Sequence, residues 1–119
     1  MPFEYFFDYQ SGQFDFIKIP KAMMTEEIFA PLSMQAKIVY GMLLDRMKLS
    51  YKNKWIDEEN KVYIIYPISE MAQDMNISRR TVINCLNELM ELGLVDKRHI
   101  GAGRRNALYI KKFVISSEK

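Results

Sequence analysis

The stretch that decides the fold is SEMAQDMNISRRTVINCLNELMELG, residues 69–93. Apolar residues recur in it at helical spacing, which predicts a short helix over 69–75 and a second helix over 78–92. Asn76 begins the turn between them, and Gly93 is the kind of residue that ends a helix. Two helices joined by so short a turn must cross closely, so the stretch predicts a helix-turn-helix.

Single residues in this stretch suit such a motif. Ser69 and Ser78 are suitable N-caps for the two helices. Ala72 is small enough for a close crossing, and Val82 lies where the second helix packs back on the first. Asn76 tolerates the positive φ that the turn needs. An ordinary helical hairpin is the alternative at this point.

The second helix has two contrasting faces at about 100° per residue. One face is apolar and consists of Val82, Cys85, Leu86 and Leu89. The opposite face is polar and consists of Arg80, Asn84, Asn87 and Glu91. Arginine can contact guanine and asparagine can contact adenine, each through two hydrogen bonds, whereas hydroxyls and free N–H groups at a helix start hold phosphates. We therefore expect a DNA-reading helix whose contact residues are Ser78, Arg79, Arg80, Thr81, Asn84 and Asn87.

A β-ribbon is predicted directly after this helix, with strands over 94–100 and 107–113. The loop 101–106 carries glycines together with Arg104 and Arg105, and arginines at such a tip contact phosphates or enter a minor groove. Further basic residues flank the loop: Lys97, Arg98, Lys111 and Lys112. A ribbon of this kind is the wing of a winged helix. For Arg79 and Arg80 on the helix before it, the alternative is that they are ordinary exposed surface residues.

Charge is divided unevenly along the chain. Residues 1–30 carry two basic and five acidic groups, whereas residues 95–119 carry seven basic and two acidic groups. A modest net charge of +2 therefore hides a basic C-terminal quarter, which favours a polyanionic partner. A solvated hairpin that happens to be rich in lysine would show the same balance.

The N-terminal half predicts three further elements. A helix over 33–48 has one apolar face and contains Gly41, which indicates close approach of a neighbouring element. The β-rich runs around a polar turn within 55–66 predict a hairpin. Residues 14–19 alternate in polarity and predict a short strand or an extended arm.

The start of the chain is unusually aromatic. Its aromatic residues are Phe3, Tyr5, Phe6, Phe7, Tyr9, Phe14 and Phe16. The winged-helix core does not need them, and so many exposed rings would form a large apolar patch. We expect this arm to form a twofold interface with a second copy of the chain. The alternative is that the arm folds back on its own domain, over the face of the helix 33–48.

Four stretches of the chain carry a family resemblance. LSMQAKIVYGMLLDR (32–46) and LSYKNKWIDEENKVYIIYPISEMA (49–72) resemble the first long helix and the following segment of the RepA N-terminal family of plasmid replication initiators. FIKIPK (16–21) and LYIKKF (108–113) match the edges of that family. Winged helices in general do not share the run from Leu32 to Ala72, so the resemblance is specific.

The resemblance implies a domain that binds double-stranded repeats in a plasmid replication origin. It also implies a homodimer, with higher assembly left open, and host replication proteins bound through residues beyond Lys119. The predicted fold is α+β and mainly helical, a winged helix-turn-helix with an extended N-terminal arm. The expected organisation is an arm and dimerisation element over 1–31, a winged helix over 32–113 and the start of a linker over 114–119.

Other function classes find little support in the sequence. It has no P-loop, metal-ligand cluster or catalytic triad with defensible placement, so we expect no enzyme, no cofactor and no metal. Cys85 is the single cysteine, expected as a small buried residue. No long apolar run or signal segment is present, so we expect a cytoplasmic protein without membrane contact. A winged-helix transcriptional repressor and a protein-interaction module are the alternative functions.

Overall fold

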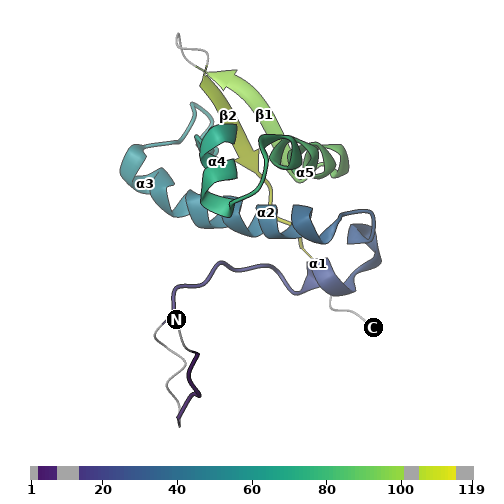
Figure 1. Ribbon diagram of the computed structural model, residues 1–119. Coiled ribbons are helices and arrows are strands. Elements are labelled where there is room, and N and C mark those ends of the chain that lie inside the picture. Colours follow the sequence, from purple (N-terminus) through teal and green to yellow (C-terminus); the bar gives the residue numbers. More distant parts are fainter. Residues whose placement is uncertain (1–2, 8–13, 101–104, 115–119) are drawn as a thin grey trace.

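The computed structural model describes residues 3–7, 14–100 and 105–114 of the chain. The helices and strands are α1 (Ala22–Thr25), α2 (Met34–Arg46), α3 (Ser50–Asn53), α4 (Ile68–Met75), α5 (Arg79–Leu92), β1 (Val95–Ile100) and β2 (Arg105–Ile110). Helix α2 lies across the middle of the molecule, with α4, α5 and the sheet on one side and the N-terminal arm on the other (Figure 1). The fold is α+β and mainly helical, as the sequence predicts.

Helix α2 begins where the sequence predicts. Ser33 is its N-cap, and its hydroxyl accepts a hydrogen bond of 3.1 Å from the Ala36 N–H. One face of the helix is buried in the core and includes Ala36, Val39, Tyr40 and Leu43. The predicted range of 33–48 overruns the helix, because regular α-helical bonding ends at Arg46 and the chain tightens into a 3-10 turn over Met47–Leu49 before α3.

Gly41 lies where the N-terminal arm crosses α2. A Cβ atom at this position would lie 2.9 Å from Ile19 Cγ1 and 3.1 Å from the Lys18 carbonyl oxygen. A Cβ at such distances would force the arm away from α2, so glycine is the residue that fits. The close approach expected at Gly41 is therefore confirmed. Residues 15–20 have no regular hydrogen-bonded structure, so of the two expectations for 14–19 the extended arm is correct and the strand is wrong.

The helix-turn-helix forms as predicted apart from one cap. Asn76 has φ of 55°, in the left-handed region, and Ala72 and Val82 are both buried at the crossing. The Ile77 N–H closes the turn by donating to the Ala72 carbonyl at 3.1 Å. The expected cap at Ser69 is wrong: α4 begins at Ile68 with Pro67 as N-cap residue, so Ser69 is already inside the helix. Proline fits here because its fixed φ and missing N–H suit the start of a helix.

Helix α5 leads directly into the wing. Gly93 ends the helix with φ of 95°, and its N–H and that of Leu94 both donate to the Leu89 carbonyl. Strands β1 and β2 pair antiparallel, from Val95 opposite Ile110 to Ile100 opposite Arg105. The second strand thus ends three residues earlier than predicted, and the chain leaves the sheet to lie against α2, where the Tyr40 hydroxyl donates to the Lys111 carbonyl at 2.6 Å.

The segment 55–66 forms the predicted hairpin only in part. A single bridge pairs Ile56 with Val62 across the turn. Beyond it, Ile64 bridges to Leu108, with reciprocal backbone hydrogen bonds of 2.9 Å. The second run of the hairpin therefore lies beside β2 and supports the base of the wing.

One hydrophobic core joins α2, α4, α5 and the sheet. Its most completely buried side chains include Met23, Val39, Tyr40, Leu43, Ile64, Met71, Val82, Leu89 and Val95. Because α5 and β1 both contribute to this core, the second helix and the wing are held as one unit.

Candidate nucleic-acid interface

The polar face of α5 is exposed and its apolar face is buried, as the helical angles predict. Arg79, Arg80, Asn84 and Asn87 are all exposed. The side chains of Val82, Cys85, Leu86 and Leu89 are buried in the core. Arg80, Asn84 and Asn87 therefore share the exposed polar face, and Arg79 is exposed at the helix start.

The start of α5 is capped by the residues predicted there. The Ser78 hydroxyl oxygen accepts from the Thr81 N–H at 3.0 Å and lies 2.9 Å from the Thr81 hydroxyl. The first bond within the helix is donated by Val82 to the Ser78 carbonyl. The N–H groups of Arg79 and Arg80 therefore precede the intrahelical bonding pattern and are available to an anion. The Ser78 hydroxyl thus caps α5, and the contacts of Ser78 and Thr81 with DNA stay predictions.

Helix α4 is anchored to α2 through Arg46. Its guanidinium donates to Glu70 at 2.8 Å and, through Nε, to the Ile65 carbonyl at 3.0 Å. The same group lies over the ring of Tyr66, with 4.3 Å from Cζ to the ring centroid. Burial raises the pKa of Tyr66, and its hydrogen bond to Asp74 raises it further, so the hydroxyl stays a neutral donor. Sequence reasoning missed this cluster, because its members are brought together only by the fold.

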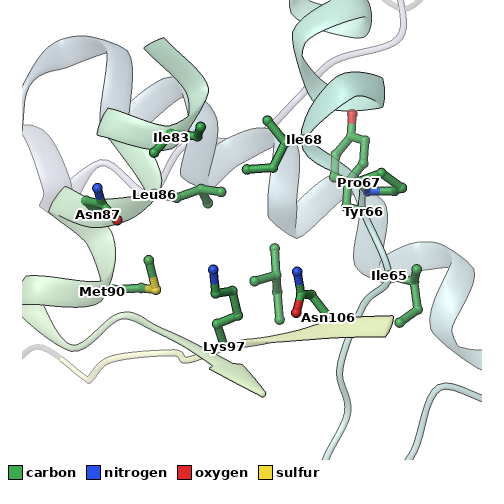
Figure 2. A pocket seen from close by; sticks show the side chains of 11 residues that line it. Ile65, Tyr66, Pro67, Ile68, Ile83, Leu86, Asn87, Met90, Lys97 and Asn106 are labelled. Atoms are coloured by element: carbon green, nitrogen blue, oxygen red, sulfur yellow. The ribbon is translucent and has the colours of Figure 1, made fainter. Parts of the chain in front are cut away.

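The polar residues of the wing fall on two faces. Lys97 and Asn106 face α5 (Figure 2). Arg98 lies on the other face, where its Cζ is 4.6 Å from the centroid of the Tyr109 ring and its Nη2 is 3.8 Å from Asp96 Oδ2. Lys111 Nζ lies 3.4 Å from the same carboxylate oxygen. The carboxylate of Asp96 thus neutralises part of the positive charge that the sequence predicts beside the wing loop.

The wing tip lies largely outside the described residues. Arg104 is one of the undescribed residues, and Arg105 is described only as the first residue of β2. The position of β1 and β2 beside α5 nevertheless points the ribbon away from α2 (Figure 1).

A groove of about 370 Å³ lies between α5, the start of α4 and the wing (Figure 2). We call it the wing groove. Its apolar lining includes Ile65, Ile68, Ile83, Leu86, Met90 and Leu108. Its hydrogen-bonding side chains include Asn87, Lys97 and Asn106. Sequence reasoning did not predict this groove, because it depends on the pairing register that aims Lys97 and Asn106 at the helix.

The aromatic arm remains exposed. Phe3 is 95% exposed, and Tyr5, Phe6, Phe7, Phe14 and Phe16 are all more than half exposed. Phe14 makes edge contacts with Phe6 and Phe16, at centroid distances of 5.9 Å and 6.1 Å. The arm therefore touches α2 near Gly41 but does not bury its phenylalanines there.

Two observations concern metal binding and the single cysteine. Within the part of the chain that the structure describes, no three His, Cys, Asp or Glu side chains are placed to hold a metal ion. Burial, with a smaller contribution from Glu88, raises the pKa of the Cys85 thiol. The thiol is thus kept protonated and poorly nucleophilic. None of the described helices is long and apolar enough to cross a membrane.

A tight helix-turn-helix, a capped second helix with an exposed polar face and an adjoining two-stranded ribbon define a winged helix-turn-helix domain. The chain belongs to the family of replication initiator protein A (RepA) N-terminal domains, whose model matches residues 15–119.

Solved structures agree with this assignment. The chain is similar to an N-terminal domain of a DNA-binding protein, at 28% identity and a TM-score of 0.80 over 98% of this chain and 88% of that one. It is similar to a Rep–DNA complex, at 29% identity and a TM-score of 0.78 over 96% of this chain and 88% of that one. It is also similar to an MDR initiator, at 30% identity and a TM-score of 0.77 over 96% and 90% of the two chains.

A curated relative is the 41 kDa protein of Lactobacillus helveticus, 25% identical over 81 residues, or 68% of this chain. The chain spans only 23% of that relative's length.

Proposed function

We propose that this chain binds double-stranded DNA sequence-specifically, at repeats in a plasmid replication origin, and thereby helps to start replication. The observation that carries the proposal is the exposed polar face of α5, which carries Arg80, Asn84 and Asn87, together with the wing that adjoins this helix. Membership of the RepA N-terminal family supports it, as does similarity to a chain solved in a Rep–DNA complex.

In the proposed complex, α5 lies in the major groove. Arg80 suits guanine there, and Asn84 and Asn87 suit adenine, because these side chains match the hydrogen-bonding edges of those bases. The free N–H groups at the start of α5 hold a phosphate. Arg104 and Arg105 at the wing tip contact the DNA backbone or the minor groove.

The proposed activity is binding alone. It needs no bond-breaking step, cofactor or metal, so we propose that the chain is not an enzyme. We place it in the cytoplasm, where plasmid DNA is replicated.

We propose that the chain acts as a homodimer through its arm. The described part of the arm has six exposed aromatic side chains, and an aromatic side chain can bury about 150–250 Å². Each partner of a stable dimer buries about 800 Å², an area that these side chains together can supply. Two copies would then present two α5 helices to repeated half-sites. We further propose that host replication proteins are partners, as the membership of a replication initiator family implies.

The proposed function is tested by selecting binding sites from a random duplex library with the intact chain. We expect one enriched sequence, bound at least about 10³-fold more tightly than a scrambled duplex, and present as repeats in the origin of the encoding replicon. Enriched sites at a promoter alone would favour a transcriptional repressor. Equal affinity for all duplexes would contradict sequence-specific binding. Absence of binding to any duplex would leave a protein-interaction module as the better account.

A further inference from the structure

Ile83 is an exposed apolar residue in the middle of α5. Its side chain is 43% exposed, whereas the neighbouring apolar residues Val82, Cys85 and Leu86 are buried. Single exposed apolar residues are ordinary on protein surfaces, so exposure by itself indicates no function. What distinguishes Ile83 is its set of neighbours.

Two polar residues of the candidate interface flank Ile83 along the helix. Arg80 lies three residues before it and Asn87 four residues after it, which places all three on one strip of the helix surface. Arg80 and Asn87 are both exposed. An apolar side chain thus interrupts a row of hydrogen-bonding side chains, so a ligand that lies along this row meets an apolar contact between two polar ones.

The wing groove extends this mixed surface. Ile83 and Ile68 line one side of the groove, and Lys97 and Asn106 line the other (Figure 2). None of the described residues that line it is acidic. The surroundings of Ile83 therefore suit a partner that is anionic overall but carries small apolar groups.

Duplex DNA presents one such group to a helix in its major groove. The base edges there offer hydrogen-bond donors and acceptors, and the apolar exception is the C5-methyl group of thymine. Isoleucine has no hydrogen-bonding group, so its favourable contact at this position is with that methyl. We propose that Ile83 is a specificity-determining residue that contacts a thymine C5-methyl group. This inference rests on the proposed function, because it requires α5 to lie in the major groove.

The test replaces each thymine of the selected duplex in turn with deoxyuridine, which removes only the methyl group. Burying one such group is worth about 0.8 kcal/mol, so we expect the intact chain to bind about fourfold more weakly when the critical thymine is replaced. Ile83→Ala should bind the thymine and deoxyuridine duplexes equally at that position, as measured by fluorescence anisotropy. The matched control is Ile38→Ala on α2, at a side chain that is 42% exposed, and it should keep the full fourfold difference.

The outcomes of this test separate the two proposals. Suppose the intact chain selects a site. If no thymine shows a methyl effect, or if Ile83→Ala keeps that effect, then the role of Ile83 is wrong and the proposed function stands. If no duplex is enriched, the proposed function fails and the role of Ile83 fails with it. The comparison of thymine and deoxyuridine duplexes is made first with the intact chain alone. If no thymine shows a methyl effect there, the role of Ile83 is contradicted whether or not Ile83→Ala folds.

Discussion

The carboxylate of Glu88 on α5 accepts two hydrogen bonds from Ser33, one from its backbone N–H at 2.7 Å and one from its hydroxyl at 2.9 Å. The same hydroxyl accepts from Ala36 and so caps α2. One half-buried contact therefore joins the start of α2 to the face of α5 that lies beside the candidate interface. This contact helps to hold α5 in its orientation on α2.

We predict that Glu88→Ala lowers the free energy of unfolding by about 1–3 kcal/mol, because the variant cannot accept the two hydrogen bonds from Ser33. Urea denaturation measures the change. Glu91→Ala, at an exposed acidic residue one turn away from the contact, should change stability by less than about 0.5 kcal/mol. Equal effects of the two variants would show that the contact with Ser33 does not stabilise the fold.

A second prediction concerns the turn of the helix-turn-helix. Asn76 has φ of 55°, a conformation that costs an ordinary residue roughly 1–2 kcal/mol and costs glycine little. Asn76→Ala should therefore lower the midpoint of chemical denaturation, whereas Asn76→Gly should leave it unchanged or raise it. The reverse order would contradict the left-handed turn.

Features that depend on neighbouring residues were predictable from the sequence. The roles of Ala72, Asn76 and Ser78 in the helix-turn-helix follow from spacing and local backbone preference. The two faces of α5 follow from the helical repeat alone. The wrong prediction of Ser69 as a cap also has a local cause. Pro67 and Ser69 both suit the start of a helix, and the spacing of apolar residues does not decide between the two positions.

Features that join distant segments were not predictable. Ser33 and Glu88 are 55 residues apart, and Ile64 pairs with Leu108, which belongs to the distant wing. Neither pairing leaves a periodic signal in the sequence. The wing groove has the same origin, because Asn106 faces α5 only in the strand register that the fold adopts.

The arm gives a third prediction. Deleting residues 1–13 removes Phe3, Tyr5, Phe6, Phe7 and Tyr9, and should yield a folded monomer with weaker binding to repeated sites. Sedimentation velocity and circular dichroism measure assembly and folding. Tyr51→Ser is a suitable control, since Tyr51 is a highly exposed aromatic residue on α3 and its replacement should not change assembly. An intact chain that is already monomeric at concentrations that saturate the DNA would contradict an arm-mediated dimer.

The wing gives a fourth prediction. Arg104→Ala combined with Arg105→Ala should weaken binding to all duplexes. The slope of log affinity against log salt concentration should become shallower by about one for each phosphate that is no longer bound. Titrations at several salt concentrations give the slope. Lys21→Ala, next to α1 and on the far side of α2 from the wing, should leave the slope unchanged. A double variant with the parental slope would show that the wing tip does not bind phosphate.

The central claim is that the exposed face of α5 distinguishes one base sequence from another. The most direct test is the ratio of affinities for the selected duplex and a scrambled duplex, measured by fluorescence anisotropy for the intact chain and for Arg80→Ala with Asn84→Ala. Removing a side chain that reads a base costs about 1–3 kcal/mol, so the ratio should fall by at least about 30-fold, while circular dichroism stays unchanged. Gln35→Ala, at an exposed position on α2, should keep the parental ratio. A folded double variant that also keeps the parental ratio would contradict the claim that α5 reads the DNA sequence.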